Sequence, residues 1–227
     1  MLICPKNSDV KIKDMAELIL IRHGQAAFGS DNYDQLTDLG RQQSAALKQH
    51  LDRTEWHPDC ILSGTMVRHA QTLEAMQLEP EDTDTGFNEY DFHNLLSVRF
   101  DGQTPKDVLQ DRKTHFRVLR DTILDWQGGG LEAAKESWIT FAQRTSSALD
   151  AAMAKQARRV LIVTSGGVIG QLVAKTLNAP SATMVDLNLQ VKNTSVSSFV
   201  FSKGRVSLNG FNATPHFDQQ PELLSYS

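Results

Sequence analysis

Two segments of the sequence place arginine or histidine shortly after a run of apolar residues. Arg22-His23-Gly24 follows one such run directly, and Arg68 lies a few residues after another. An arginine guanidinium matches phosphate oxygens in a two-point contact. A histidine beside such cations is suited to attack a phosphoryl group. These residues therefore predict chemistry at phosphorus, provided that the fold brings them together.

A carboxylate and a glycine-rich turn follow two further segments. Glu89 comes shortly after a candidate third strand, and the turn Ser165-Gly166-Gly167 follows the strongest apolar run of the chain. A carboxyl group can give a proton to a leaving oxygen. Adjacent glycines let backbone N–H groups at a helix start approach an anion closely. Both features fit a site that handles phosphate.

The elements that must position these residues alternate between strand and helix. A short apolar run suits a strand buried on both faces of a sheet. Leucines from Leu36 to Leu51 recur at helical spacing, and Thr37 is placed to cap that helix. The other predicted helices lie at 65–76, from 104–105 to 128–130, around 138–152, and from the 165–167 turn to about 178–180. The predicted strands lie at 17–22, 59–63, 85–87 and 160–163, with a hairpin over 196–208. Ligands of open α/β sheets bind beyond the carboxyl ends of the strands, so the polar residues should meet at one edge.

This alternation predicts a three-layer α/β/α sandwich with a mainly parallel sheet, an antiparallel edge strand and a small helical insertion. At 227 residues, the chain can bury one substantial core. We predict an N-terminal extension at 1–16, a single domain at 17–215 and a C-terminal tail at 216–227. Residues 91–136 are less regular, and we expect them to form a helical cap over the sheet.

Composition and charge narrow the classes of partner. The net charge is −4 and the pI is about 6.0, which argues against nucleic-acid binding and against a polybasic membrane anchor. The apolar stretch at the N-terminus is too short for a signal peptide or a membrane span. The two cysteines, Cys4 and Cys60, have no metal-binding spacing and fit a reduced, cytoplasmic setting. We expect no metal and no cofactor.

Three motifs resemble those of the histidine phosphatase superfamily, which includes the cofactor-dependent phosphoglycerate mutases. Residues 20–24, LIRHG, resemble the family signature, and residues 37–43, TDLGRQQ, resemble its LTxxGxxQ helix start. Residues 63–72, SGTMVRHAQT, are similar to its second-arginine motif, with Arg68 and Thr72 in the expected places. The resemblance covers about residues 17–210.

The resemblance implies a phosphatase that works through a phosphohistidine. His23 is the implied nucleophile, and Arg22 and Arg68 are the implied ligands of the phosphoryl oxygens. Glu89 is implied as the acid that protonates the leaving oxygen and then as the base that activates water. Such an acid needs a raised pKa at neutral pH. Asp91 is the alternative for this role.

The glycine-rich turn departs from the family pattern, because the resemblance implies a second histidine where Ser165 stands. A serine hydroxyl, like the Gly166 backbone, can donate a hydrogen bond to a phosphoryl oxygen but brings no positive charge. Charged hydrogen bonds contribute about 1.5–3 kcal/mol, against about 0.5–1.5 kcal/mol for neutral ones. The loss of one donor in a charged transition state costs about 10²–10³ in rate. The alternative is therefore a protein with weak or no catalytic activity that binds phosphoryl groups or has a regulatory role.

Two histidines lie close enough in sequence to replace the missing one. His69 follows Arg68 directly, and we expect it to face elsewhere because neighbouring helical residues point in different directions. His93, four residues after Glu89, is the better candidate. Three more histidines have no motif around them and are expected at the surface: His57, His115 and His216.

The loop after the first motif bears on the substrate. The mutases carry a Trp-Asn pair and further basic residues there, whereas residues 25–29 of this chain are Gln-Ala-Ala-Phe-Gly. This difference argues against a mutase activity. Phe28 and Tyr33 either line an apolar part of the pocket or belong to the core. We expect a small phosphorylated metabolite or a phosphoprotein as substrate. A dinucleotide-binding enzyme is the least favoured alternative, because the GGxxG pattern at the 165–167 turn is too unspecific to indicate a dinucleotide site. A hairpin at the sheet edge would allow a homodimer.

Overall fold

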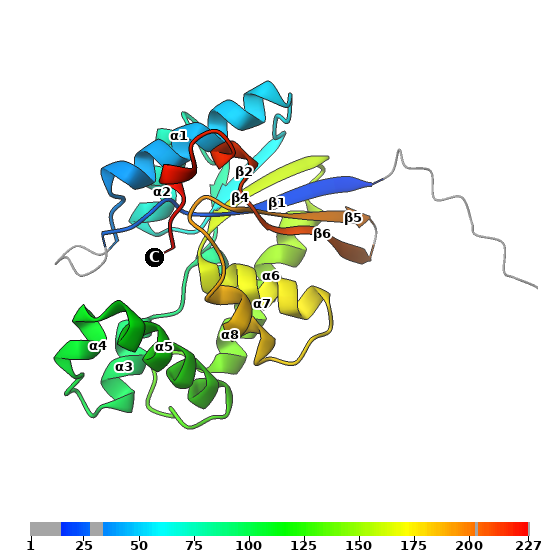
Figure 1. Ribbon diagram of the computed structural model, residues 1–227. Coiled ribbons are helices and arrows are strands. Elements are labelled where there is room, and N and C mark those ends of the chain that lie inside the picture. The colour runs from blue at the N-terminus through cyan, green and yellow to red at the C-terminus, as the bar shows by residue number, and fades with distance from the viewer. Residues whose placement is uncertain (1–14, 28–33, 203, 227) are drawn as a thin grey trace, which may run out of the picture.

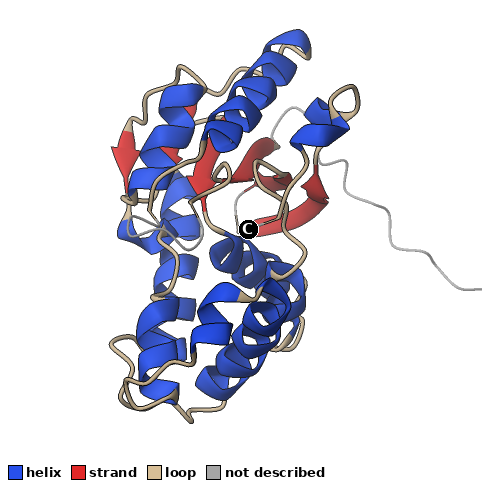
Figure 2. Cartoon of the chain, turned by 60° about the vertical axis from the view of Figure 1, so that its left-hand side comes forward, coloured by secondary structure: helices blue, strands red, loops and turns tan. Residues whose placement is uncertain are grey.

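A six-stranded sheet forms the centre of the protein (Figures 1 and 2). The structure is a computed structural model, and it describes residues 15–27, 34–202 and 204–226. The strands are β1 (Ala16–Arg22), β2 (Cys60–Ser63), β3 (Asp82–Thr83), β4 (Arg159–Thr164), β5 (Val196–Ser202) and β6 (Arg205–Ala213), in the order β3-β2-β4-β1-β5-β6. The first four are mutually parallel, whereas β5 and β6 pair antiparallel. The predicted α/β class and C-terminal hairpin are confirmed: β5 runs antiparallel to β1, and β6 runs antiparallel to β5.

The central strands are buried on both faces because helices cover both sides of the sheet. On β1, Leu18 and Leu20 face one apolar cluster, whereas Ile19 and Ile21 face the other. This split follows from the two-residue repeat of a strand. It explains why the sequence of β1 is a continuous apolar run rather than an alternation of apolar and polar residues.

Two helices pack on one face of the sheet and two on the other (Figure 1). The first pair is α1 (Asp38–Arg53) and α2 (Val67–Ala75); the second is α6 (Trp138–Ala154) and α7 (Gly166–Thr176). The Thr37 hydroxyl caps α1 as predicted, accepting from the Gly40 N–H at 3.1 Å. This arrangement is the predicted three-layer sandwich.

The segment between β3 and α6 contributes three helices that lie below the sheet in Figure 1. They are α3 (Phe92–Arg99), α4 (Lys106–Gln110) and α5 (Arg112–Gln127), and α8 (Thr183–Asn188) lies beside α5. Leu95, Ile123 and Trp126 belong to the same apolar cluster as one face of the sheet. The cap therefore shares a core with the sheet.

Two details of the predicted elements are wrong. Residues Thr85–Phe87 form a 3₁₀ turn, not a strand, because the Asp84 carboxylate accepts from the Gly86 N–H at 2.7 Å and closes the chain locally. The single helix expected from 104–105 onward is two helices. Asp111 ends α4 and caps α5 by accepting from the Thr114 N–H at 2.7 Å.

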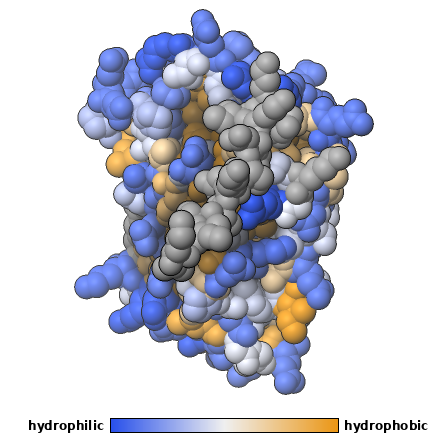
Figure 3. Space-filling model, turned by 90° about the vertical axis from the view of Figure 1, so that its right-hand side faces the viewer, coloured by the Kyte–Doolittle hydropathy of each residue, from blue (hydrophilic) through white to orange (hydrophobic). Residues whose placement is uncertain are grey.

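The surface in Figure 3 is mainly hydrophilic where it is not covered by atoms drawn in grey, with apolar atoms in separate patches. Exposed large hydrophobic side chains in the described part of the chain include Ile139 and Leu177. Among the helices of the described ranges, none has the length and apolar character that crossing a membrane requires.

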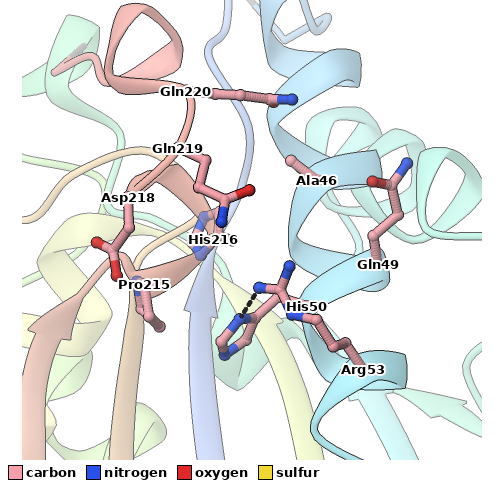
Figure 4. A pocket seen from close by; sticks show the side chains of 9 residues that line it. All are labelled: Ala46, Gln49, His50, Arg53, Pro215, His216, Asp218, Gln219 and Gln220. Atoms are coloured by element: carbon pink, nitrogen blue, oxygen red, sulfur yellow. Dashed lines mark hydrogen bonds between the residues drawn. The ribbon is translucent and has the colours of Figure 1, made fainter.

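The C-terminal segment packs against α1 through two short 3₁₀ turns, η3 (Pro215–Phe217) and η4 (Pro221–Leu223). The Gln43 side chain of α1 donates to the Leu223 carbonyl at 2.6 Å. A small pocket remains between α1 and this segment, lined by residues that include His50, Arg53, His216 and Asp218 (Figure 4).

His216 is buried under this pocket, which corrects the expectation of a surface position. Its exposed fraction is 7 %, and its Nε2 lies 3.0 Å from the Thr194 hydroxyl oxygen. That hydroxyl donates to the Asn193 carbonyl, so His216 must be the donor. Burial, with a further contribution from His50, lowers the pKa of His216 from 6.5 to about 4. His57 is exposed as expected, and His115 is half-buried.

We predict that His216 makes the protein acid-sensitive. Below pH 6.5 the unfolded chain takes up a proton at this residue, whereas the folded protein does so only near pH 4, so stability falls by about 3 kcal/mol over that window. His216→Gln keeps a donor but cannot titrate. Urea unfolding at pH 7 and pH 4.5 should show a smaller loss of stability in this variant than in the wild type. The exposed His57→Gln variant is the control, and equal losses in all three proteins would refute the assignment.

Candidate functional site

The parallel pairing of β1 with β4 places the first motif beside the glycine-rich turn. Arg22 lies opposite Thr164 in the register, and the His23 N–H donates to the Thr164 carbonyl at 2.9 Å. Both motif side chains are buried, with exposed fractions of 8 % for Arg22 and 3 % for His23. The next residue after Thr164 is Ser165, so the two strand ends meet as the sequence predicts.

One ring nitrogen of His23 is fixed by its own backbone neighbour. Nδ1 lies 2.7 Å from the Gly24 carbonyl oxygen, which can only accept a hydrogen bond. The proton of the neutral ring therefore sits on Nδ1, and Nε2 keeps its lone pair. Burial lowers the pKa of His23 well below 6.5, and the Arg68 and Arg22 guanidiniums and His69 lower it further. His23 is thus a neutral imidazole at pH 7.

The two arginines predicted for the site are both held in place. The Arg22 guanidinium donates to the Val191 carbonyl in the loop before β5. Arg68, 4 % exposed at the start of α2, pairs through Nη1 with the Asp34 carboxylate at 2.8 Å. Asp34 also accepts from the Val67 N–H at 2.9 Å and so caps α2. Sequence reasoning missed Asp34, which no motif marks.

His69 lies in the site, which corrects the expectation that it faces elsewhere. The side chain is fully buried, its Nε2 lies 2.8 Å from the Ser165 hydroxyl oxygen, and its ring centroid is 5.8 Å from that of His23. Consecutive residues do diverge along a helix, but α2 points its N-terminus at the site, so both Arg68 and His69 reach it from the first turn. His93, the candidate that the sequence favoured, is exposed on α3.

The space for the His69 ring comes from Gly64. A Cβ atom at Gly64 would lie 2.4 Å from His69 Nδ1, well inside van der Waals contact. Any other residue at this position would displace the ring. A glycine directly after β2, followed by a histidine in the first turn of the next helix, is the signal in the sequence that could have identified His69.

Glu89 reaches the same site from the other side. Its carboxylate accepts from the Gly167 N–H at 2.9 Å and from the Tyr90 N–H at 3.2 Å. A Cβ at Gly167 would lie 2.2 Å from the nearer carboxylate oxygen, so only glycine allows this approach. Burial raises the pKa of Glu89, although the Gly167 N–H and the charges of Arg68 and Arg22 oppose the shift. The raised pKa favours the protonated acid.

The remaining predicted residues divide between the site and its surroundings. Gly166 begins α7 beside Arg22: a Cβ there would lie 3.6 Å from Arg22 Nε. Asp91, the alternative acid, instead caps α3 by accepting from the Asn94 N–H at 2.9 Å and pairs with Lys135 at 3.2 Å. Phe28 and Tyr33 lie outside the described residues, as do Cys4 and most of the predicted N-terminal extension. In the described ranges, no group of three or more His, Cys, Asp or Glu side chains could hold a metal ion.

We predict that His23 keeps the neutral tautomer with the proton on Nδ1 well below pH 6.5. Arg68→Gln removes a nearby positive charge, so the pKa of His23 should rise in this variant. Titration of ¹⁵N-labelled histidine by NMR measures both the tautomer and the pKa. Arg53→Gln, at the exposed end of α1, is the control and should leave His23 unchanged. A His23 that carries its proton on Nε2 would contradict the geometry.

Comparisons with known proteins agree with this architecture. The model of the histidine phosphatase superfamily (branch 1) matches residues 18–214. A search of curated proteins gives no match. Among solved structures, a phosphoserine phosphatase mutant from Entamoeba histolytica in complex with phosphoserine is 21 % identical, with a TM-score of 0.62 over 88 % of this chain and 98 % of that one.

Two further structures are similar to the same degree. The mycobacterial glucosyl-3-phosphoglycerate phosphatase is 22 % identical, with a TM-score of 0.61 over 88 % of this chain and 99 % of that chain. The α-ribazole phosphatase from Shigella flexneri is 21 % identical, with a TM-score of 0.63 over 87 % and 96 % of the two chains. At these identities the likeness concerns the fold. Because the family match spans most of the sequence, the chain belongs to the histidine phosphatase superfamily (branch 1).

Proposed function

We propose that the protein is a phosphatase that hydrolyses a phosphate monoester through a phosphohistidine on His23. The observation that carries the proposal is the state of this residue: a buried, neutral imidazole with Nδ1 held by Gly24 and two buried arginines beside it. Burial and the neighbouring cations keep the lone pair of Nε2 available at neutral pH. The same cations attract the anion that this nitrogen would attack.

In the first step, Nε2 of His23 forms a bond to phosphorus while the bond from phosphorus to the leaving oxygen breaks. The leaving oxygen takes a proton from the Glu89 carboxyl. In the second step, the Glu89 carboxylate takes a proton from water, whose oxygen attacks phosphorus as the bond to Nε2 breaks. Inorganic phosphate leaves, and both side chains return to their initial states.

Four groups are suited to hold the phosphoryl oxygens. Arg22 and Arg68 bring charge, and the carbonyl and carboxylate that they contact fix their directions. The Ser165 hydroxyl and the Gly166 backbone N–H add neutral donors at the start of α7. We propose that these donors act on the transferring group, where oriented hydrogen bonds contribute most to the rate.

A small phosphorylated metabolite or a phosphoprotein remains the proposed substrate class. The three similar structures reported above all carry the name of a phosphatase, which favours hydrolysis over a mutase reaction. We also propose a cytoplasmic setting, in keeping with the free, buried Cys60.

A protein that binds phosphoryl groups without turnover is the second candidate, and Ser165 is the observation that favours it. At this position the resemblance implies a histidine, and the hydroxyl brings no charge of its own. Such a protein would bind phosphate or vanadate through Arg22 and Arg68 but would release no product. The assay below separates the two functions.

We predict that the purified protein hydrolyses p-nitrophenyl phosphate without added metal, and that His23→Ala abolishes this activity because no other group in the scheme attacks phosphorus. The control is His57→Ala, whose side chain is exposed away from the site and whose activity should equal that of the wild type. Absence of turnover in the wild type, with vanadate still bound, would replace the phosphatase by the binding protein.

We predict a pH profile set by His23 and Glu89. The first step needs neutral His23 and protonated Glu89, so kcat/KM should show no acid fall near the ordinary histidine pKa of 6.5 and should fall as the pH rises through the raised pKa of Glu89. Glu89→Gln should remove the alkaline fall. This variant should also lose more activity on an alkyl phosphate than on p-nitrophenyl phosphate, because p-nitrophenolate leaves without a proton. Equal losses on both substrates would exclude Glu89 as the acid.

A further inference from the structure

Ser165 occupies the N-cap position of α7 but does not cap that helix. An N-cap serine ordinarily accepts a hydrogen bond from an N–H in the first turn of its own helix. Here the hydroxyl makes no such bond, and the Gly167 N–H is bonded to Glu89 instead. The serine side chain is fully buried and turned toward α2. Its hydrogen bonds therefore serve the site rather than the helix.

Two groups from α2 meet the Ser165 oxygen. Arg68 Nη2 lies 3.4 Å from it and can only donate. His69 Nε2 lies 2.8 Å from it and either donates or accepts, according to the tautomer. The arrangement of hydrogen bonds around Ser165 thus depends on which nitrogen of His69 carries the proton.

The environment of the other nitrogen decides the tautomer. His69 Nδ1 is buried against Gly64, whose backbone raises the pKa of His69, but Nδ1 makes no hydrogen bond of normal geometry among the described residues. A proton on Nδ1 would have only this misaligned backbone contact, and a poorly satisfied buried donor is costly. A proton on Nε2 has the serine oxygen as its partner. The Nε2–H tautomer is therefore favoured, and His69 donates to Ser165.

A hydroxyl oxygen accepts two hydrogen bonds and donates one. If Arg68 and His69 fill both acceptor positions of Ser165, its proton must point to a third group. The adjacent strand end carries His23, whose ring centroid is 5.8 Å from that of His69. A phosphoryl group attached to or approaching His23 would supply the acceptor.

We propose that His69 is a positioning residue, which donates from Nε2 to the Ser165 oxygen and so directs the serine proton onto the phosphoryl oxygens at His23. The inference rests on the phosphatase proposed above. It explains how a site with serine at this position keeps an oriented donor: the imidazole comes from α2 and acts through the hydroxyl. The charged and titratable groups around His69 are Arg68 on its own helix and His23, directly after β1.

The first test compares two amides at position 69. The side-chain nitrogen of glutamine reaches the place of Nε2, whereas that of asparagine reaches only the place of Nδ1. His69→Gln should stay within about 3-fold of the wild-type kcat on p-nitrophenyl phosphate, and His69→Asn should lose about 10²- to 10³-fold, the cost of one oriented donor. Equal activity of His69→Asn and the wild type, or equal loss in both variants, would overturn the proposal.

The second test is a double-mutant cycle with Ser165→Ala. Because His69 acts through the serine hydroxyl, Ser165→Ala should lose as much activity as His69→Asn, and the double variant should lose no more than either. Losses that multiply in the double variant would mean that the two residues act independently, which contradicts the proposal. Thermal unfolding of each variant shows whether it is folded.

A measurement on the wild type needs no variant to fold and no turnover. NMR of ¹⁵N-labelled histidine should show the proton of His69 on Nε2, and a proton on Nδ1 alone would overturn the inference. The outcomes separate the two proposals. Absence of activity in the wild type would refute the phosphatase proposal. If the wild type is active and its activity depends on His23, but His69→Asn is as active as the wild type, only the role of His69 is refuted.

Discussion

The pairing of β1 with β4 is the constraint on which the site depends. Parallel neighbours in register end at the same level, so Arg22 and His23 emerge beside Thr164 and Ser165. On its other side β4 pairs with β2, which brings Gly64 and the first turn of α2 to the same edge. A shift of one residue in either ladder would turn the site residues to the other face of the sheet. In this register Leu18 and Leu20 pack into one apolar cluster, and Ile19 and Ile21 pack into the other.

Burying two guanidiniums at this edge has electrostatic consequences for every titratable neighbour. Arg68 pairs with the Asp34 carboxylate and Arg22 donates to a backbone carbonyl, and both guanidiniums keep their positive charge. That charge, added to burial, lowers the pKa of both His23 and His69. For Glu89, burial outweighs the same cations, and its pKa rises. One environment thus favours a neutral imidazole at His23 and the protonated form of Glu89, the pair that the proposed phosphoryl transfer to histidine needs.

Much of this arrangement could be predicted from the sequence, and the failures have physical causes. The strands and α1 follow from apolar runs, helical spacing and the Thr37 cap, because burial and local hydrogen bonds dominate there. The 3₁₀ turn at Thr85–Phe87 was misjudged because one aspartate side chain decides it. His69 was misjudged because direction along a helix says little at a helix end that points into a site. Asp34 could not be found, since its role depends on a contact 34 residues away in sequence.

Glu89, the proposed acid, follows a different part of the structure from His23, the proposed nucleophile. Tyr90, the residue after Glu89, packs edge-on against Phe141 of α6 and at a tilt against Trp126 of α5, with ring centroids 5.6 and 5.5 Å away. Its hydroxyl accepts a hydrogen bond from Asn188 of α8 at 3.0 Å. The chain beside Glu89 is therefore anchored among α5, α6 and α8, whereas the carboxylate itself is held by the Gly167 N–H at the start of α7. A substitution in these helices would therefore move Glu89 more than His23, whose backbone is bonded to the end of β4. We expect such a change to alter the proposed proton transfer to the leaving group, while Arg22 and His23 keep their positions at the end of β1.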